Sequence, residues 1–551
     1  MNRTPAIAML ALPAFGPAPR RFQRASGARR RNALVGSIVA CLFVSGCSTL
    51  ADLRRPDVKI ADVWHATVPH AGRTGDLLSW WSTFADPSLT ALIAAAQVEN
   101  PGLESAAAEI ERARATRASA QAGLYPVVEG STSVGRSGTG GDTANQVAAA
   151  TTTGGGLDAT WEIDLFGKTR QKGEAARLRL HERVADWHEA RVSLAAEVAD
   201  YYVQYRACRQ LERTYSAEIA SQNETIRAME TAETSGFTSS ADLALGRAGV
   251  ASSASTRTAQ RAECEVLIKS LTRLTGGDEP LVRDLLAKGK SGIPTPKTLK
   301  LVAVPADALR QRPDINALEL EIAASIAEVG AAKADLYPSL SLGGSVTIGS
   351  STLTGTAAPW SFGPALSIPL FDGGSRRAAV RSAAAAYDVA VAAYKSGVLD
   401  AIAEVETALV RIDSTRRRIG DATVAARNYR AYFDAVDTNW KAGGANLLDR
   451  EEARRSAQSA EVSLIEIRRD SVRFWIALYK ALGGGWDATA AEPGNLQKEK
   501  RETCSDASDL PSHCPFPGRE PSSRRGACAR PTKRGVSADR RLGTACGTLL
   551  A

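Results

Sequence analysis

Apolar and polar residues alternate in three parts of the chain. In residues 157–165 the odd positions are apolar and the even positions are polar, and the same alternation returns in residues 340–348 and 362–370. A period of two predicts strands with one apolar face and one polar face. We therefore expect two strands in each half of the chain, joined by loops rich in Gly, Ser and Thr at 136–156 and 349–359.

Two other stretches have the features of very long helices. Residues 168–233 and 376–441 contain no proline and only occasional glycine. At 1.5 Å per residue, a helix of about 65 residues is roughly 100 Å long. Each stretch ends at a glycine-containing loop, around Gly236 or Gly443, and a second helical segment follows. The many small residues predict close-packed antiparallel coiled coils.

The chain contains an internal duplication. Landmarks of the first half recur in the same order about 205 to 212 residues later: Pro101, Leu124-Tyr125-Pro126, Leu165-Phe166-Gly167 and Gly236 return as Pro313, Leu336-Tyr337-Pro338, Leu370-Phe371-Asp372-Gly373 and Gly443. Five segments are expected, namely an N-terminal extension with signal peptide (1–46), an anchored segment (47–85), two repeats (86–290 and 300–486) and a disordered or non-native tail (487–551). Unpaired strand edges in lipid cost several kcal/mol per backbone group, so closure of the strands requires further copies of the chain.

Charge is concentrated at the two ends. The formal net charge is +8, yet residues 1–46 hold seven arginines and no acid, and residues 501–551 hold nine basic and five acidic residues. The remaining body is mildly acidic, which argues against nucleic acid as a partner.

The N-terminus has the pattern of a secretory signal. Three arginines at 29–31 precede the apolar run 33–44 and the small residues Ser45 and Gly46 before Cys47. The run is too short to cross a bilayer and instead predicts a signal peptide. Val44 to Cys47 resembles the bacterial lipobox, which predicts a covalent lipid on Cys47 as the one attached group. Residues 1–28 precede a signal peptide of normal length, which indicates a start codon assigned too early.

Four phrases in order carry a family resemblance: Trp80-Trp81-Ser82-Thr83-Phe84-Ala85-Asp86-Pro87, Trp161-Glu162-Ile163-Asp164-Leu165-Phe166-Gly167, Leu309-Arg310-Gln311-Arg312-Pro313-Asp314-Ile315 and Pro369-Leu370-Phe371-Asp372-Gly373-Gly374. With the lipobox they cover about residues 47–486. The chain resembles the TolC-like outer-membrane efflux family, in the lipidated branch named after NodT and OprM.

The resemblance implies a mixed α/β membrane protein. In this family a homotrimer forms a twelve-stranded transmembrane β-barrel, four strands per subunit, continued by a long periplasmic α-helical barrel. It would be lipid-anchored in the outer membrane and pass drugs or other small molecules from a periplasmic adaptor protein and an inner-membrane RND-type transporter to the exterior. Two alternatives are the outer-membrane channel of a type I secretion system and a periplasmic coiled-coil scaffold without a pore.

Candidate functional residues lie near the helical tips. Asp434 and Asp437 share a helix face where the family places its pore-lining carboxylates, and a trimer would gather six of them as a gate, raising some pKa values by crowding. The alternative is a solvated helix face. The two tip loops resemble the adaptor-contacting surfaces of the family, and the candidate residues there are Gly236, Asp242, Gly443 and Asp449. The glycines are equally compatible with helix capping alone.

Cys208 and Cys264 are equally far from Gly236 along the chain. In a hairpin that turns at this glycine they face each other, which predicts a disulfide in an oxidising compartment; the alternative is two small buried apolar residues. The five histidines are scattered and predict no metal site, and no catalytic motif is present. The sequence therefore indicates a protein that is not an enzyme.

Overall fold

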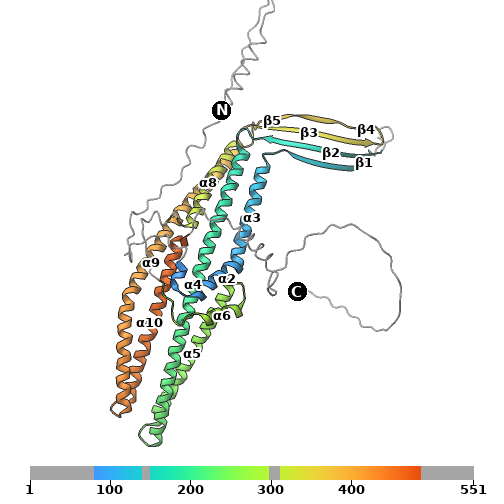
Figure 1. Cartoon of the computed structure of the whole chain (residues 1–551). Coiled ribbons are helices and arrows are strands. Elements are labelled where there is room, and N and C mark those ends of the chain that lie inside the picture. The colour runs from blue at the N-terminus through green and yellow to red at the C-terminus, as the bar shows by residue number, and fades with distance from the viewer. Residues whose placement is uncertain (1–79, 139–148, 297–308, 310, 486–551) are drawn as a thin grey trace, which may run out of the picture. The chain divides into compact units, whose positions relative to one another are not determined.

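A computed structural model describes residues 80–138, 149–296, 309 and 311–485. Its helices repeat in pairs of equal length (Figure 1). α3 (Pro101–Ala122) and α8 (Pro313–Ala334) have 22 residues each, α4 (Lys168–Thr234) and α9 (Ser375–Lys441) have 67, and α5 (Ser240–Leu274) and α10 (Leu447–Ala481) have 35. Two shorter helices, α2 (Pro87–Glu99) and α6 (Glu279–Lys288), and a 3-10 turn, η2 (Gly483–Gly485), accompany them.

The long helices begin with the same local device in both halves. Gly167 and Gly374, the N-cap residues of α4 and α9, have φ values of 80° and 89°, a left-handed conformation that glycine adopts without steric cost. A preceding aspartate accepts the free backbone N–H groups of the first turn. Asp164 accepts from the N–H of Arg170 at 2.9 Å, and Asp372 accepts from the N–H of Arg376 at 3.0 Å. The chain thus passes from sheet to helix with the helix N-terminus satisfied.

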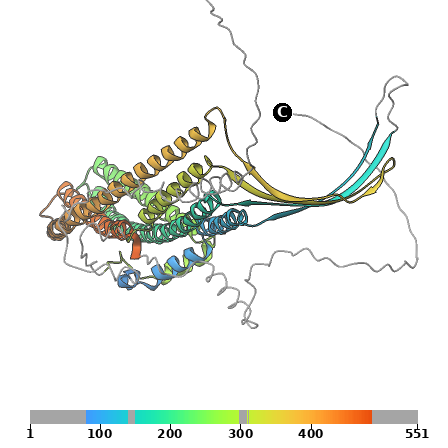
Figure 2. The ribbon, with the colours of Figure 1, turned by 90° about the horizontal axis from the view of Figure 1, so that it is seen from above.

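The strands form one antiparallel sheet. β1 (Val127–Ser137) pairs with β2 (Ala150–Ile163), β2 pairs with β3 (Ser339–Ser351), and β3 pairs on its other side with β4 (Gly355–Ala357) and β5 (Trp360–Ser367). β4 and β5 follow β3 in a single register, so they act as one strand interrupted at residues 358–359. The strands curve along their length (Figure 2).

The expected loops between the strands were wrong in their extent. Residues 150–156 and 136–137, assigned to a loop by their glycine, serine and threonine content, belong to β2 and β1. Residues 349–351 likewise belong to β3, and 355–357 form β4. Backbone pairing with a neighbouring strand outweighs the low strand propensity of glycine here, because each of these residues has a partner in the ladder.

The main hydrophobic core lies where the first half of α4 meets the ends of α5 and α10. Val198, Tyr202, Leu271 and Leu478 are fully buried there. Trp80 packs on this core and stacks on Tyr479, with ring centroids 4.9 Å apart. Toward the hairpin turns buried apolar residues become sparse, and a small cluster around Phe433 and Ala453 remains on the second hairpin. The hairpins therefore extend well beyond their core.

Candidate functional site

The sheet separates apolar from polar side chains. Residues paired across antiparallel strands point to the same face, and side chains alternate along each strand. One face carries the large apolar residues Val128, Val134, Leu157, Trp161, Ile163, Leu340, Leu342, Val346, Ile348, Trp360, Phe362 and Leu366. The opposite face carries mainly serine, threonine and glycine, together with the acids Glu129, Asp158 and Glu162.

Within a single subunit most of this apolar face is exposed. Val134 and Trp360 are each 77% exposed, and Phe362 is 72% exposed. An apolar surface of this extent is unfavourable in water at about 25 cal/mol per Å² and indicates contact with an apolar phase. Among the described strands, β1 has a neighbour only on its β2 side, and β5 has one only on its β3 side. The sheet therefore has two edges that can pair with other chains.

The hairpin turns are built alike. Gly236 and Gly443 have φ values of 76° and 80° and no atom within 4 Å of the position that a Cβ would take. The backbone N–H of Phe237 donates to the carbonyl of Ala232 at 2.8 Å, which closes the end of α4. Helix capping thus explains both glycines. The side chain of Phe237 is 87% exposed at this tip.

The two tip aspartates lie in the first turns of the returning helices. The backbone N–H of Asp242 donates to Ser239 Oγ at 3.1 Å, and that of Asp449 donates to Asn446 Oδ1 at 2.8 Å. Both carboxylates are exposed and sit at helix N-termini, where a negative charge is favourable. These aspartates therefore have a local structural role, and their exposure leaves them accessible to a partner.

Asp434 and Asp437 differ in their surroundings. Asp434 is 60% exposed and forms an ion pair with Arg430 one turn earlier, at 3.3 Å. Asp437 is 15% exposed and forms ion pairs with Lys441 at 2.7 Å and with Arg450 of α10 at 2.6 Å. The two carboxylates share a stretch of α9, but only Asp437 is held in place by the neighbouring helix.

Arg450 is the centre of a network that the sequence analysis missed. It is 2% exposed, and its guanidinium reaches Asp437 of α9, Thr225 Oγ1 of α4 and Glu451 of its own helix. The guanidinium carbon also lies 4.8 Å from the centre of the Trp440 ring. One turn later Arg454 forms ion pairs with Glu218 of α4 and with Glu451. Two arginines of the second hairpin thus fasten it to the first.

A sequence signal for Arg450 did exist. α5 and α10 start 207 residues apart, so Arg450 occupies the position that Leu243 has in the first repeat. Leu243 is buried. An arginine at a position that the duplication marks as buried indicates a buried ion pair.

The network sets the ionisation of Asp437. Burial raises the pKa of this carboxyl, but hydrogen bonds from Lys441 and Arg450 outweigh it, so the pKa lies below its ordinary value. Within one subunit the direction is thus opposite to the one expected from crowding of six carboxylates. Two cations satisfy the carboxylate locally before any second subunit is considered.

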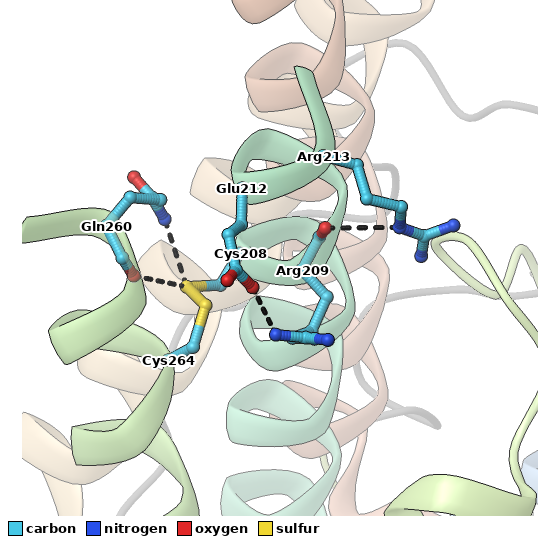
Figure 3. The surroundings of a disulfide bond; sticks show 6 residues. All are labelled: Cys208, Arg209, Glu212, Arg213, Gln260 and Cys264. Carbon is cyan, nitrogen blue, oxygen red and sulfur yellow. Dashed lines mark hydrogen bonds and ion pairs between the residues drawn. A yellow bond between two sulfur atoms is a disulfide. The ribbon is translucent and has the colours of Figure 1, made fainter. Parts of the chain in front are cut away.

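A disulfide joins the two helices of the first hairpin (Figure 3). Cys208 of α4 and Cys264 of α5 have their Cα atoms 5.7 Å apart, within the usual range for a disulfide. Gln260 Nε2 donates to Cys208 Sγ at 3.0 Å, and both cysteines are buried. The pairing expected from their equal distance to Gly236 is therefore the one that the structure forms.

Other expected sites are not brought together or lie elsewhere. Cys47, the expected lipidation site, lies outside the described residues. In the part of the chain that the structure covers, no group of three or more His, Cys, Asp or Glu residues could hold a metal ion. None of the helices in that part is long and apolar enough to cross a membrane.

Comparison with known proteins identifies the family. The family described as "Outer membrane efflux protein" matches residues 92–277 and 304–484, which is more than half of the chain. The chain is an outer membrane efflux protein. The resemblance drawn from the four sequence phrases is thereby confirmed.

Relatives of this efflux protein include nodulation protein T of Rhizobium leguminosarum bv. trifolii, 29% identical over 82% of this chain and 97% of the relative. Outer membrane protein OprJ of Pseudomonas aeruginosa is also 29% identical, over 82% of this chain and 96% of the relative. Among solved structures, the outer-membrane channel OprN is 30% identical, with a TM-score of 0.69 and coverage of 79% of this chain and 99% of that one.

The open state of the MtrE outer membrane channel of Neisseria gonorrhoeae is 25% identical to this efflux protein, with a TM-score of 0.68 and coverage of 80% of this chain and 98% of that one. These relatives are channels, and their lengths are covered almost completely. The efflux protein is therefore an outer-membrane channel, the exit duct of an efflux system.

Proposed function

We propose that three copies of this efflux protein assemble into one duct. The observation that carries this proposal is the amphipathic sheet with two open edges. If β1 of one copy pairs with β5 of the next, the edges disappear and the apolar face turns outward to lipid. The serine-, threonine- and glycine-rich face then lines a polar lumen, with four strand positions from each subunit because β4 and β5 share one register.

The transported molecules we propose are small organic compounds. Relatives are described as a toluene efflux pump outer membrane protein, TtgI of Pseudomonas putida, and a pyoverdine export outer membrane protein, OpmQ of Pseudomonas aeruginosa. They are 28% and 26% identical to this chain, and each match covers 82% of it. Their differing cargo favours a duct that accepts what an inner-membrane RND-type transporter delivers through a periplasmic adaptor, rather than a duct that selects its own substrate.

The hairpin tips are the surfaces we propose for adaptor contact. Gly236 and Gly443 form the turns, and Asp242 and Asp449 present exposed carboxylates one turn further on. Exposed apolar side chains accompany them, Phe237 at the first tip and Leu448, 66% exposed, at the second. Apolar anchors beside acidic rims suit a partner with an apolar groove and basic residues around it.

The gate we propose consists of Asp434 and Asp437 of each subunit, near the end of α9. Asp434, the more exposed of the two, is available to a narrowed lumen, and Asp437 is coupled through Arg450 to the first hairpin. A carboxylate ring favours cations. Movement of α9 relative to α4 and α10 would break the hydrogen bonds and the ion pair of Arg450 with Asp437 and Thr225. Their loss is the part of the free energy of opening that arises within each subunit.

Single-channel conductance in planar bilayers tests duct and gate together. Detergent-extracted full chain should form cation-preferring pores, and Asp434→Ala/Asp437→Ala should lower the cation preference or raise the open level. Asp421→Ala, on an exposed face of α9 away from the turn, is the matched control. A confirmed trimer that neither inserts nor conducts would contradict the duct, whereas pores unaffected by the double substitution would contradict only the gate.

We further propose that Cys47 carries the lipid anchor at the outer membrane. Support comes from the lipobox-like Val44 to Cys47. Incorporation of radiolabelled palmitate into the full chain, compared with Cys47→Ser, measures this directly. Equal labelling of both proteins would overturn the assignment.

A further inference from the structure

A cavity of about 370 Å³ lies between α4, α5 and the end of α6. Four arginines line it, namely Arg206, Arg209 and Arg213 of α4 and Arg283 of α6, and no carboxylate is among the lining residues. It is remote in sequence from the strands, from both hairpin turns and from Asp434 and Asp437, so the proposed gate does not account for it.

Arg206 is a buried cation at this cavity. It is 7% exposed, its guanidinium carbon lies 4.7 Å from the ring centre of Tyr202, and its Nη2 donates to the Tyr202 hydroxyl at 2.7 Å. That hydroxyl in turn donates to Asp86 Oδ2 at 2.5 Å. The Nε of Arg206 is buried without an acceptor among the described residues. Burial of a guanidinium is unfavourable unless an anion or further acceptors compensate it.

The nearby acids leave part of this charge uncompensated. Glu212 pairs with Arg209, and Glu265 and Glu279 both pair with Arg283. Neither Arg206 nor Arg213 has an ion pair within the described part of the chain; Arg213 Nε donates to the backbone carbonyl of Arg209 at 3.3 Å. Arg206, whose link to the Asp86 carboxylate runs through the Tyr202 hydroxyl, and the exposed Arg213 thus border the cavity without a direct ion pair among the described residues.

Gly289 lies directly against the guanidinium of Arg206. A Cβ on Gly289 would lie 1.6 Å from Arg206 Nη2 and 2.7 Å from the Tyr202 hydroxyl, so only glycine permits the observed position of the guanidinium. Arg206 is thus held by a cation–π contact and a hydrogen bond with Tyr202, and Gly289 leaves space for its guanidinium. A cation held this firmly is preorganised for a ligand.

We propose that this cavity binds a small oxyanion, with Arg206 and Arg213 as its principal cations. Phosphate and carboxylate share the required chemistry, because both accept paired N–H groups from a guanidinium. The cavity is large enough for such a group together with water. The bound anion compensates Arg206 and links α4 to the end of α6. This site shares no residue with the proposed gate.

Calorimetric titration of the detergent-extracted full chain with inorganic phosphate, and separately with acetate, at constant ionic strength tests the proposal. Wild-type protein should bind at least one of the two saturably, and the anion that binds more tightly identifies the chemical class of the natural ligand. Arg213→Gln should weaken binding about tenfold or more, because a charge-assisted hydrogen bond is lost. Arg206→Gln should weaken binding further. If the Arg206→Gln protein does not fold, Arg213→Gln still tests the site.

Arg257→Gln is the matched control, since it removes the same charge from an exposed position of α5 outside the cavity. Its affinity should equal that of the wild type. An equal loss in Arg257→Gln would show general charge attraction and overturn the site, as would the absence of saturable binding of either anion. An experimental structure with a carboxylate of this same chain between Arg206 and Arg213 would also overturn it. Channel conductance should be unchanged in Arg213→Gln, so failure of this site is distinguishable from failure of the duct.

Discussion

The two helical hairpins have the same dimensions but are held by different interactions. In each, a helix of 67 residues turns into one of 35, and corresponding positions are 207 residues apart. The first hairpin is crosslinked by Cys208 and Cys264; the same positions in the second are Thr415 and Ser471. The second hairpin has instead the buried cation Arg450, where the first has a leucine.

The difference follows from how each returning helix is packed. No residue of α5 between 244 and 263 is buried within the subunit. α10, in contrast, packs against both α9 and α4 and buries residues along most of its length, Arg450 and Arg454 included. Between residues 244 and 263, α5 thus has little packing to hold it, so a covalent bond contributes most to this hairpin. The two hairpins thus keep the same backbone arrangement while the interactions that hold each returning helix differ.

The largest effect is expected from removal of the disulfide. Cys208→Ser/Cys264→Ser should lower the free energy of unfolding by about 4 kcal/mol, because the bond closes a loop with a sequence separation of 56. Denaturant unfolding at fixed protein and detergent concentration measures this. Wild-type protein treated with reductant should match the double variant. Free thiols at both positions in untreated protein, detected by intact mass after alkylation, would refute the crosslink.

Arg450→Leu gives the second hairpin the residue of the first. We expect the free energy of unfolding to fall by about 3 kcal/mol. This is the lower end of the range for a broken buried ion pair, because Asp437 is 15% exposed. Asp437 also loses one of the two cations that lower its pKa, so this pKa should rise toward its ordinary value. Unfolding and carboxyl titration by NMR are the measurements. The control is the exposed Arg455, five residues further along α10: Arg455→Leu should change the free energy of unfolding by less than about 0.5 kcal/mol. Equal losses in the two variants would contradict a stabilising role of the network.

A third difference between the hairpins concerns pH. Burial lowers the pKa of His188 on α4 from 6.5 to about 4, with a smaller contribution from Arg191, whereas the corresponding residue of α9 is the exposed Lys395. Between these two pKa values the unfolded chain binds a proton that the folded chain does not. The contribution of His188 to stability is therefore complete above pH 6.5 and is lost as the pH falls toward 4.

His188→Gln isolates this effect. Relative to the variant, wild-type protein should lose about 2 kcal/mol between pH 7 and pH 5. The quantity to compare is the difference in the free energy of unfolding between wild type and variant. Burial raises the pKa of Glu182 to about 7, which makes the stability of both proteins depend on pH with the opposite sign. Denaturant unfolding at the two pH values measures it. A constant difference between the proteins would mean that His188 is not neutral in the fold.

The sequence predicted the long helices almost to the residue, since proline-free stretches bounded by glycine have few alternatives. It placed the α4 end at 233, where the helix ends at Thr234, and the α9 start at 376, where the helix starts at Ser375. The strands were predicted where apolar and polar residues alternate. Residues 150–156 were missed because threonine and glycine carry no alternation, and the strand there exists only through its neighbours.

The site was predicted unevenly for a similar reason. Cys208 and Cys264 could be paired because hairpin geometry alone brings them together. The contacts of Arg450 with Thr225 and of Arg454 with Glu218 could not be found in the same way, because α4 meets α10 only through packing between the hairpins. Local periodicity contains no information about such contacts. The duplication does, when a buried position changes from leucine to arginine.

The smallest effect, and the one that should be equal in both hairpins, concerns the caps of the returning helices. Ser239 Oγ accepts from the N–H of Asp242 and Asn446 Oδ1 from that of Asp449, at the same position of each repeat. Ser239→Ala and Asn446→Ala should each cost about 1 kcal/mol. Hydrogen exchange of the two turns, compared with Ser253→Ala in the middle of α5 as control, measures it. If only one cap substitution lowered stability strongly, the two hairpins would also differ in their turns. Equal losses of stability would mean that they differ only in the interactions between helices.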